Sequence, residues 1–456
     1  MAENNHINEI KILVAGAVDS SKSTTIGVLV TGKLDNGEIY KEVDKHEHEK
    51  NSGKTSSISM HYMVRDKDSG KSSKDEDRIS KVISLCNLCG HQQYFKNTLY
   101  GMSGTYADYG MLLVNINRGI TEMGVEHMNV LVHLDIPFFI VLTKLDLCQE
   151  KDMYIKAHDQ LHKILRRFRR KGVSLRVDKD YNITESYLPY TDMMSQRSDI
   201  VPIFSSCNRS GQNINVLKDF MFNLTSRPVW EPSTIKNNVF FITSVYNVKH
   251  VGLVVSGICK SRKNIKISDL MVIGPHHGKF YSVKVKSIQN NIRQDIDELC
   301  NGESGCICIR FIGKDILNRN QIIKGMILAD NENEITESVT SEFTARVVVL
   351  QHHTSIKTRY QSVIHMGPIR QTARVYCEDE YLRTNDKAIV GFKFVYRPEY
   401  MEIGTRFFAR EGNTRIAGEV IDLKLPGFAI NASKEDEESD RRFVKHKKES
   451  NLGRSE

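Results

Sequence analysis

Long apolar runs are missing from this chain of 456 residues. No stretch approaches the ~20 apolar residues that a helix needs to cross a bilayer. The first residues, MAENNHINEIK, also lack the basic and then apolar segments of a secretory signal peptide. We therefore expect a cytoplasmic protein without a membrane-spanning segment. In that compartment the nine cysteines are expected to be reduced thiols.

A complete motif for zinc or haem is missing as well. The stretch CNLCGH contains Cys86, Cys89 and His91, but Gly90 interrupts the CxxCH pattern that haem attachment needs. A zinc site would need a second ligand pair at a matching spacing, and the pair at 306 and 308 is separated by one residue only. We interpret these cysteines as small buried side chains.

An excess of acidic residues is also absent. The formal net charge is +8 and the pI is about 8.8, which favours nucleic acid or another polyanion as a partner. The densest basic run, RRFRRK, covers residues 166–171 and ends a helix that we expect from about Lys151. Cations also suit the negative end of a helix, so an ordinary solvated face is the alternative interpretation.

A chain of this length should form two to four domains. Residues 10–230 alternate buried strands with helical patterns, which predicts an α/β domain with helices on both faces of a parallel sheet. The expected strands are KILVAG, KVISL, YGMLLVNINR, PFFIVLTKLD and DIVPIFSS, and the expected helices begin at Ser23, at about Lys151 and at Gly211.

Short alternating strands dominate the remainder. They predict a closed β-barrel at 237–331 and a second β-rich segment at 341–430, separated by the polar linker NENEITESVTSE. Polar and charged composition predicts disorder at 1–9 and 433–456 and a mobile loop at 65–81.

The stretch VAGAVDSSKSTT, residues 14–25, nearly matches the phosphate-binding pattern GxxxxGK[ST]. Gly16, Lys22 and Ser23 fit, but Ser21 replaces the second glycine. Such a loop binds phosphate through backbone N–H groups and a helix N-terminus, while the Lys reaches the outer phosphates and the hydroxyl binds Mg²⁺. Taken alone, the match is about equally compatible with a polar turn between a strand and a helix.

Three further motifs follow expected strands. In TKLD, Asp146 can accept hydrogen bonds from the N1–H and 2-amine of guanine, and the stem of Lys144 can cover the base. In NLCGH, the backbone of Gly90 can contact a γ-phosphate and His91 can orient a water. The stretch SSCN at 205–208 can brace the guanine loop.

With these motifs, the chain resembles a translation-factor GTPase of the eukaryotic GTP-binding protein 1 and 2 family. The resemblance is collinear over roughly residues 10–425. It rests on the residues 16–37, 46–57, 80–98, 143–148, 252–258, 347–373 and 407–418. It implies an α/β P-loop G domain followed by two β-barrel domains, as in elongation factor Tu, with GTP/GDP and Mg²⁺ as cofactors.

The resemblance also implies a role for individual residues. The phosphate-binding residues would be Gly16, Asp19, Ser20, Ser21, Lys22, Ser23, Thr24 and Gly90. Thr143, Lys144, Asp146 and either Ser206 or Cys207 would bind guanine. Ser23, Thr55 and, through water, Asn87 would hold the metal, and His91 would be catalytic.

Three positions depart from the family pattern. Ser21 adds a Cβ where the backbone must approach phosphate, and Asn87 lacks the charge of the usual Asp. When the stretch GQN is aligned with the family pattern, Cys207 falls at the position of the guanine-bracing serine, and Ser206 is one residue away. We therefore expect a GTPase of reduced activity, a monomer, acting with aminoacyl-tRNA and the ribosome. The alternative is a non-catalytic pseudo-GTPase that binds RNA or protein, including RNA-decay machinery.

Overall fold

The computed structural model describes residues 8–44, 46–52, 55–66, 79–148, 151–227 and 235–436. The expectations for 1–7, for most of the loop at 65–81 and for 437–456 lie outside these residues. The chain divides into two compact units, one of Met1–Ile273 with Tyr281–Asp330 and the other of Gly274–Phe280 with Asn331–Glu456. Among the described helices, none is both long and apolar enough to cross a membrane.

The first domain is built on a seven-stranded sheet in the order β2-β3-β1-β4-β5-β7-β6. Its strands are β1 (Asn8–Ala15), β2 (Ser59–Asp66), β3 (Ile79–Asn87), β4 (Tyr109–Asn115), β5 (Phe138–Thr143), β6 (Lys171–Ser174) and β7 (Ile200–Ser205). Only β2 runs antiparallel to its neighbour; the other pairs are parallel. Every residue of β4, β5 and β7 is buried, as expected for a parallel sheet covered on both faces.

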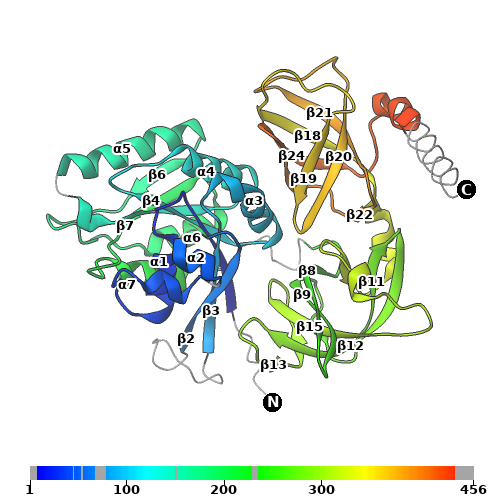
Figure 1. Cartoon of the computed structure of the whole chain (residues 1–456), viewed down its shortest axis with the longest axis horizontal. Coiled ribbons are helices and arrows are strands. Elements are labelled where there is room, and N and C mark those ends of the chain that lie inside the picture. Colours follow the sequence, from blue (N-terminus) through cyan, green and yellow to red (C-terminus); the bar gives the residue numbers. More distant parts are fainter. Residues whose placement is uncertain are drawn as a thin grey trace, which may run out of the picture. The chain divides into compact units, whose positions relative to one another are not determined.

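Seven described α-helices belong to this domain. They are α1 (Lys22–Thr31), α2 (Glu47–Ser52), α3 (Phe95–Gly104), α4 (Glu122–His133), α5 (Lys151–Arg167), α6 (Leu188–Gln196) and α7 (Ile214–Asn223). Ile26, Met194 and Phe220 join α1, α6 and α7 to one face through a common apolar cluster. Figure 1 shows α3, α4 and α5 on the opposite side of the sheet. The predicted α/β domain is therefore confirmed.

The four sequence motifs follow β1, β3, β5 and β7. These strands are parallel, so their carboxyl ends lie at the same edge of the sheet. β1 pairs with β3 on one side and with β4 on the other. The connections that follow β1 and β3 therefore leave the sheet in opposite directions. In open α/β sheets, ligands bind at the point where the connections diverge in this way.

The second domain is a six-stranded barrel. Its strands are β8 (Val239–Val248), β9 (Gly252–Lys260), β11 (Leu270–His276), β12 (Lys279–Asn290), β15 (Ser304–Phe311) and β16 (Ile327–Ala329). They follow the order β11-β16-β8-β9-β15-β12, and the pairing of β11 with β12 closes the barrel. The barrel interior is filled by apolar side chains such as Phe240 and Ile307. The sequence patterns missed β11, which carries a Gly-Pro pair, and β16, which has three residues.

The third domain is another closed barrel, in the order β18-β21-β20-β19-β23-β24. Its strands are β18 (Glu342–Gln351), β19 (Gln361–Met366), β20 (Ile369–Cys377), β21 (Lys387–Phe394), β23 (Arg406–Glu411) and β24 (Thr414–Asp422). Phe343, Phe392 and Phe407 meet in its core, with ring centroids 5.0–5.7 Å apart. The linker before it contains a short helix, α8 (Glu332–Ile335), and Ile335 is buried.

The start of the expected disordered tail differs from the structure. Residues 430–436 are helical, and both Ser433 and Asp436 are buried. The carboxylate of Asp436 accepts a hydrogen bond from the Tyr376 hydroxyl at 2.8 Å and pairs with Arg359 at 2.6 Å. Polar composition predicted disorder here because it does not reveal that these polar groups find partners on the barrel.

Candidate nucleotide site

The loop after β1 has a backbone that strongly constrains its residues. Gly16 has φ +143°, and a Cβ there would come within 2.6 Å of the Ser20 hydroxyl oxygen. Asp19 and Ser21 have φ of 62° and 65°, in the left-handed region. Ser21 is the residue before α1. This conformation costs about 1–2 kcal/mol for a residue with a Cβ, so serine carries a strain that glycine would not.

Lys22 opens helix α1, and its side chain turns back over the loop. Its Nζ donates a hydrogen bond to the Ala17 carbonyl at 2.7 Å. Gly90 packs closely against Lys22 and Ala17. A Cβ on Gly90 would clash with Lys22 Nζ and would lie 2.8 Å from the Ala17 carbonyl carbon. Burial lowers the pKa of Lys22 to about 8, so the side chain is still largely cationic at neutral pH. The structure thus brings Lys22 and Gly90 together.

His127, which stands in none of the sequence motifs, holds the start of the phosphate loop. The Gly16 N–H donates to His127 Nδ1 at 2.9 Å, and the buried His127 ring stacks on Phe95 with centroids 5.6 Å apart. Burial, with a smaller effect of Lys22, lowers the pKa of His127 to about 3. His127 is therefore neutral and accepts through Nδ1. A lone histidine outside the motifs gave no signal of this role, and no helix was predicted around it.

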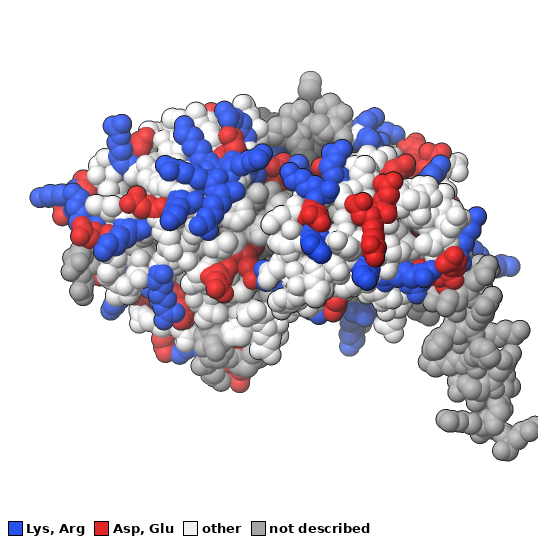
Figure 2. Space-filling view, turned by 90° about the horizontal axis from the view of Figure 1, so that it is seen from above, with Lys and Arg blue, Asp and Glu red and all other residues white. Residues whose placement is uncertain are grey.

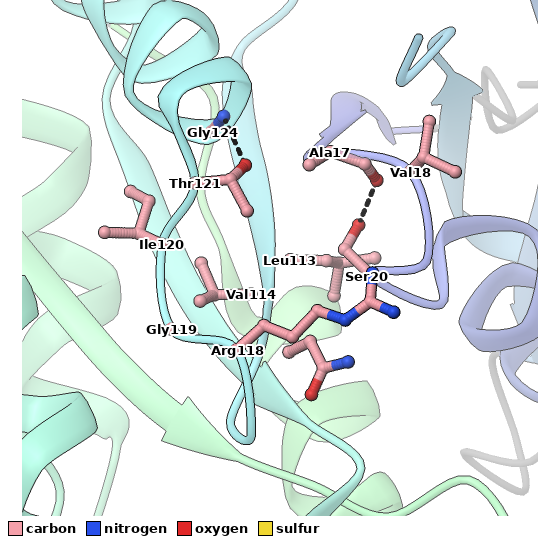
Figure 3. A pocket seen from close by; sticks show the side chains of 11 residues that line it. Ala17, Val18, Ser20, Leu113, Val114, Arg118, Gly119, Ile120, Thr121 and Gly124 are labelled. Carbon is pink, nitrogen blue, oxygen red and sulfur yellow. Dashed lines mark hydrogen bonds between the residues drawn. The ribbon is translucent and has the colours of Figure 1, made fainter.

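A small hollow lies beside the loop (Figure 3). It is lined by Ala17, Val18, Ser20, Leu113, Val114, Asn115, Arg118, Gly119, Ile120, Thr121 and Gly124. Arg118 Nη1 pairs with Asp19 Oδ2 at 3.2 Å across the rim, and both side chains are well exposed. The Ser20 hydroxyl donates to the Ala17 carbonyl at 2.9 Å. Asp19 and Ser20 therefore help to shape the loop.

The proposed metal ligands meet around the Ser23 hydroxyl. Its oxygen lies 3.1 Å from Thr55 Oγ1 and accepts a hydrogen bond from Asn87 Nδ2 at 3.2 Å. It also donates to Asp44 Oδ1 at 3.1 Å, a residue that the motifs did not reveal. Burial raises the pKa of Asp44, while the bond from Ser23 opposes that shift.

The donor set suits a hard cation that also binds phosphate. Two buried acceptor atoms, Asp44 Oδ2 and Asn87 Oδ1, have no hydrogen-bond partner among the described residues. Hydroxyl, amide and carboxylate oxygens are ligands that Mg²⁺ accepts directly or through water, together with nucleotide phosphates. The described residues contain no group of three His, Cys, Asp or Glu side chains that could hold a metal without such a nucleotide. Cys86 and Cys89 are buried, in agreement with their interpretation as small core side chains.

Thr55 is positioned by a carboxylate of the preceding helix. Glu49 Oε1 accepts hydrogen bonds from the backbone N–H groups of Ser56 and Ser57, at 2.7 and 2.9 Å, and from their hydroxyls at 2.8 and 3.1 Å. Burial acts to raise the pKa of Glu49, but these bonds and one from His46 outweigh it and lower the pKa to about 2. The segment that carries Thr55 is thus fixed by an ionised side chain.

The motif TKLD lies beside the stretch 205–208. Lys144 has φ 62°, and Cys207 Sγ donates to Asp146 Oδ1 at 3.3 Å. The Ser206 hydroxyl is buried without a partner among the described residues. Of the two candidates, Cys207 is therefore the side chain that contacts Asp146.

Two further bonds join the guanine loops to the phosphate loop. Thr143 Oγ1 donates to the Ser20 carbonyl at 3.2 Å, and Asn208 Nδ2 donates to Thr25 Oγ1 at 3.0 Å. His91 follows Gly90 at the same edge of the sheet. Its described contacts are local: Nδ1 accepts from the Gln93 N–H at 3.1 Å, and the ring lies 6.2 Å from that of Tyr94.

Comparison with known proteins decides the family. A family model described as the elongation factor Tu GTP binding domain matches residues 7–249. GTP-binding protein 2 from Homo sapiens is 32% identical to this chain, over 92% of the chain and 70% of that protein. The chain belongs to the elongation factor Tu-like GTP-binding protein 1 and 2 family.

Two other comparisons agree. GTP-binding protein 1 from Xenopus laevis is 35% identical over 92% of the chain, which spans 64% of that relative. A crystal structure of a bacterial selenocysteine-specific elongation factor superposes with a TM-score of 0.64, at 19% identity, over 91% of this chain and 58% of that one. That structure shares the fold. The predicted family and the predicted order of a G domain and two barrels are therefore confirmed, and GTP or GDP is the nucleotide that this kind of domain binds.

In this family member, we expect Ser21→Gly to relieve strain and to tighten nucleotide binding. The change should raise the free energy of unfolding by about 1 kcal/mol, because glycine adopts φ 65° without a Cβ penalty. Ser268→Gly is the matched control, since Ser268 has φ 77° in the first barrel. Both should stabilise the protein in urea, but only Ser21→Gly should lower the Kd for GTP in a fluorescence titration. An unchanged Kd would show that the loop tolerates serine.

We expect Glu49→Gln to loosen the segment that carries Thr55. Hydrogen bonds to a charged group contribute ~1.5–3 kcal/mol, so amide exchange at Ser56 and Ser57 should accelerate about 10- to 100-fold, measured by hydrogen–deuterium exchange. Glu47→Gln, on the exposed side of α2, is the control. The folded pKa is depressed, so the stabilisation is present above pH ~4.5 and is lost as pH falls toward about 2. Equal exchange in both variants would contradict this role.

Proposed function

We propose that this chain is a GTPase that binds GTP with Mg²⁺, hydrolyses it to GDP and acts in the cytoplasm with aminoacyl-tRNA and the ribosome. The observation that carries the proposal is the convergence of four motifs at one sheet edge, with Lys22 beside Gly90, Ser23 beside Thr55 and Asp146 beside Cys207. Family membership and the elongation-factor fold support it.

The phosphate loop would bind the nucleotide mainly through its backbone. Helix α1 begins at Lys22, so the loop leads into a helix N-terminus, which favours an anion. Lys22 would exchange its bond to the Ala17 carbonyl for one to the outer phosphates. Gly90 leaves room for this movement because it has no Cβ to crowd Lys22.

Magnesium would neutralise phosphate charge when it is bound with the nucleotide. Ser23 and Thr55 would provide hydroxyl ligands, and Asn87 would contact a metal-bound water. Their present spacing, 3.1–3.2 Å around Ser23 Oγ, supports a shared role. Glu49 would keep Thr55 available by holding the two serines that follow it.

Hydrolysis would depend on His91, which would orient the attacking water. Its local contact with the Gln93 N–H leaves the ring only partly buried, so a partner can change its orientation. Catalysis of phosphoryl transfer is mostly positioning and electrostatic stabilisation. A ribosome that moves His91 toward the γ-phosphate would therefore raise the rate.

The surface of the G domain supports an RNA partner. Helix α5 ends at Arg166 and Arg167, which are exposed, as are Lys163, Arg169 and Lys171 around them. In Figure 2 Lys and Arg side chains gather on the face of this domain that is turned to the viewer. Such a surface attracts the phosphates of RNA.

We expect Asp146→Asn to change base selection from guanine to xanthine. The carboxylate accepts from N1–H and the 2-amine of guanine, whereas an amide can donate to the 2-oxygen of xanthine. The variant should bind GTP about 10- to 100-fold more weakly than wild type and XTP more tightly, in a fluorescence titration. Asp159→Asn, which removes the same charge from an exposed side chain of α5, is the control. Wild-type protein that accepts ATP as readily as GTP would contradict the proposal.

We expect ribosomes to accelerate GTP hydrolysis in a single-turnover assay. His91→Ala should lose about 10²-fold or more of that acceleration and keep its affinity for GTP, because its role is in the transition state. Gln92→Ala, an exposed neighbour, should behave as wild type. The acceleration should fall steeply with salt, since phosphate contacts release counterions. If wild type hydrolyses no GTP with ribosomes present, the chain is a binding module and not an enzyme.

A further inference from the structure

Asp44 is the acidic side chain that touches Ser23. It follows the short helix η1 (Ile39–Glu42), where its backbone N–H donates to the Tyr40 carbonyl at 3.0 Å. The residue is 4% exposed. One carboxylate oxygen accepts from Ser23 Oγ at 3.1 Å, and the other is buried without a hydrogen-bond partner among the described residues.

Asn87 approaches Ser23 from the other side with the opposite chemistry. It ends β3, is fully buried, and directs an N–H donor to Ser23 Oγ at 3.2 Å. A donor cannot bind a cation, and the remaining amide oxygen has no charge. The family pattern has an aspartate at this position. Asn87 therefore provides no negative charge to the metal in this chain.

We propose that Asp44 supplies the negative charge that Asn87 lacks, and that Asp44 belongs to the Mg²⁺ site of this chain. The inference rests on the proposed nucleotide-binding function. A buried carboxylate oxygen without a partner is unfavourable unless a cation or a bound water satisfies it. Mg²⁺ keeps several waters when it is bound by one or two carboxylates and phosphates, so Asp44 can hold the ion through such a water.

The other acidic residues near the loop are already engaged. Asp19 is exposed and pairs with Arg118, and Glu49 is saturated by the two serines and His46. Asp146 contacts Cys207 at the guanine end of the site. Among the described residues, Asp44 is thus the carboxylate in hydrogen-bond contact with Ser23, the helix α1 residue expected to bind the metal.

The test measures the Mg²⁺ dependence of GDP and GTP binding rather than hydrolysis. Fluorescence titrations with chelator and with increasing Mg²⁺ would compare wild type, Asp44→Asn, Asn87→Asp and the double variant. The matched control is Glu42→Gln, which removes the same charge two residues away from an exposed side chain paired with Lys33. Thermal unfolding of each variant would verify that it is folded.

The variants should separate a metal role from a structural one. In Asp44→Asn, the Mg²⁺ concentration needed for half of the affinity gain should rise about 10- to 100-fold, as expected for the loss of a group that holds a metal's ligands. Affinity with chelator should remain as in wild type. Asn87→Asp should restore most of the Mg²⁺ response in the Asp44→Asn background and add less to wild type, because the two charges serve one ion. Glu42→Gln should match wild type.

Three results would overturn the inference while leaving guanine-nucleotide binding intact. The first is a Mg²⁺ response in Asp44→Asn equal to that of Glu42→Gln. The second is that Asp44→Asn loses as much nucleotide affinity with chelator as it loses with Mg²⁺, which would mean that Asp44 only positions Ser23. The third is no recovery in the double variant. A wild-type protein that binds neither GDP nor GTP at any Mg²⁺ concentration would instead overturn the proposed function, and this inference with it.

Discussion

The candidate site depends on parallel pairing around β1. Because β1 lies between β3 and β4, the loop that follows it emerges beside the end of β3, and both loops contact Lys22. The same parallel order continues through β5 and β7, which places the guanine motif and its brace at that edge. Four segments that lie between residues 14 and 208 of the chain therefore meet because of the strand order alone. Complete burial of β4, β5 and β7 makes the arrangement rigid.

Much of this could be predicted because the signals are local. Apolar runs of strand length indicated the sheet, and four of them are followed by a short motif. The barrels could be predicted from alternating strands, although β19 and β23 were not recognised because their polar and apolar residues do not alternate cleanly.

The contacts that tune the site could not be predicted. His127, Glu49 and Asp44 each act through a contact with a residue whose position depends on the fold, and none stands in a motif. The choice between Ser206 and Cys207 also required the fold, because neighbouring side chains at a strand end point in different directions. Substitutions in the motifs are thus best understood together with the side chains that surround them.

The helical segment at 430–436 determines where the third domain ends. Ser433 donates to Glu342 and accepts from Lys393, while Asp436 satisfies Tyr376 and Arg359. A protein shortened at the first charged residue of the tail would leave a buried tyrosine hydroxyl and an arginine without their acidic partner. The folded boundary of this domain therefore lies beyond the point at which the composition turns polar, and truncated versions of the protein should keep Asp436.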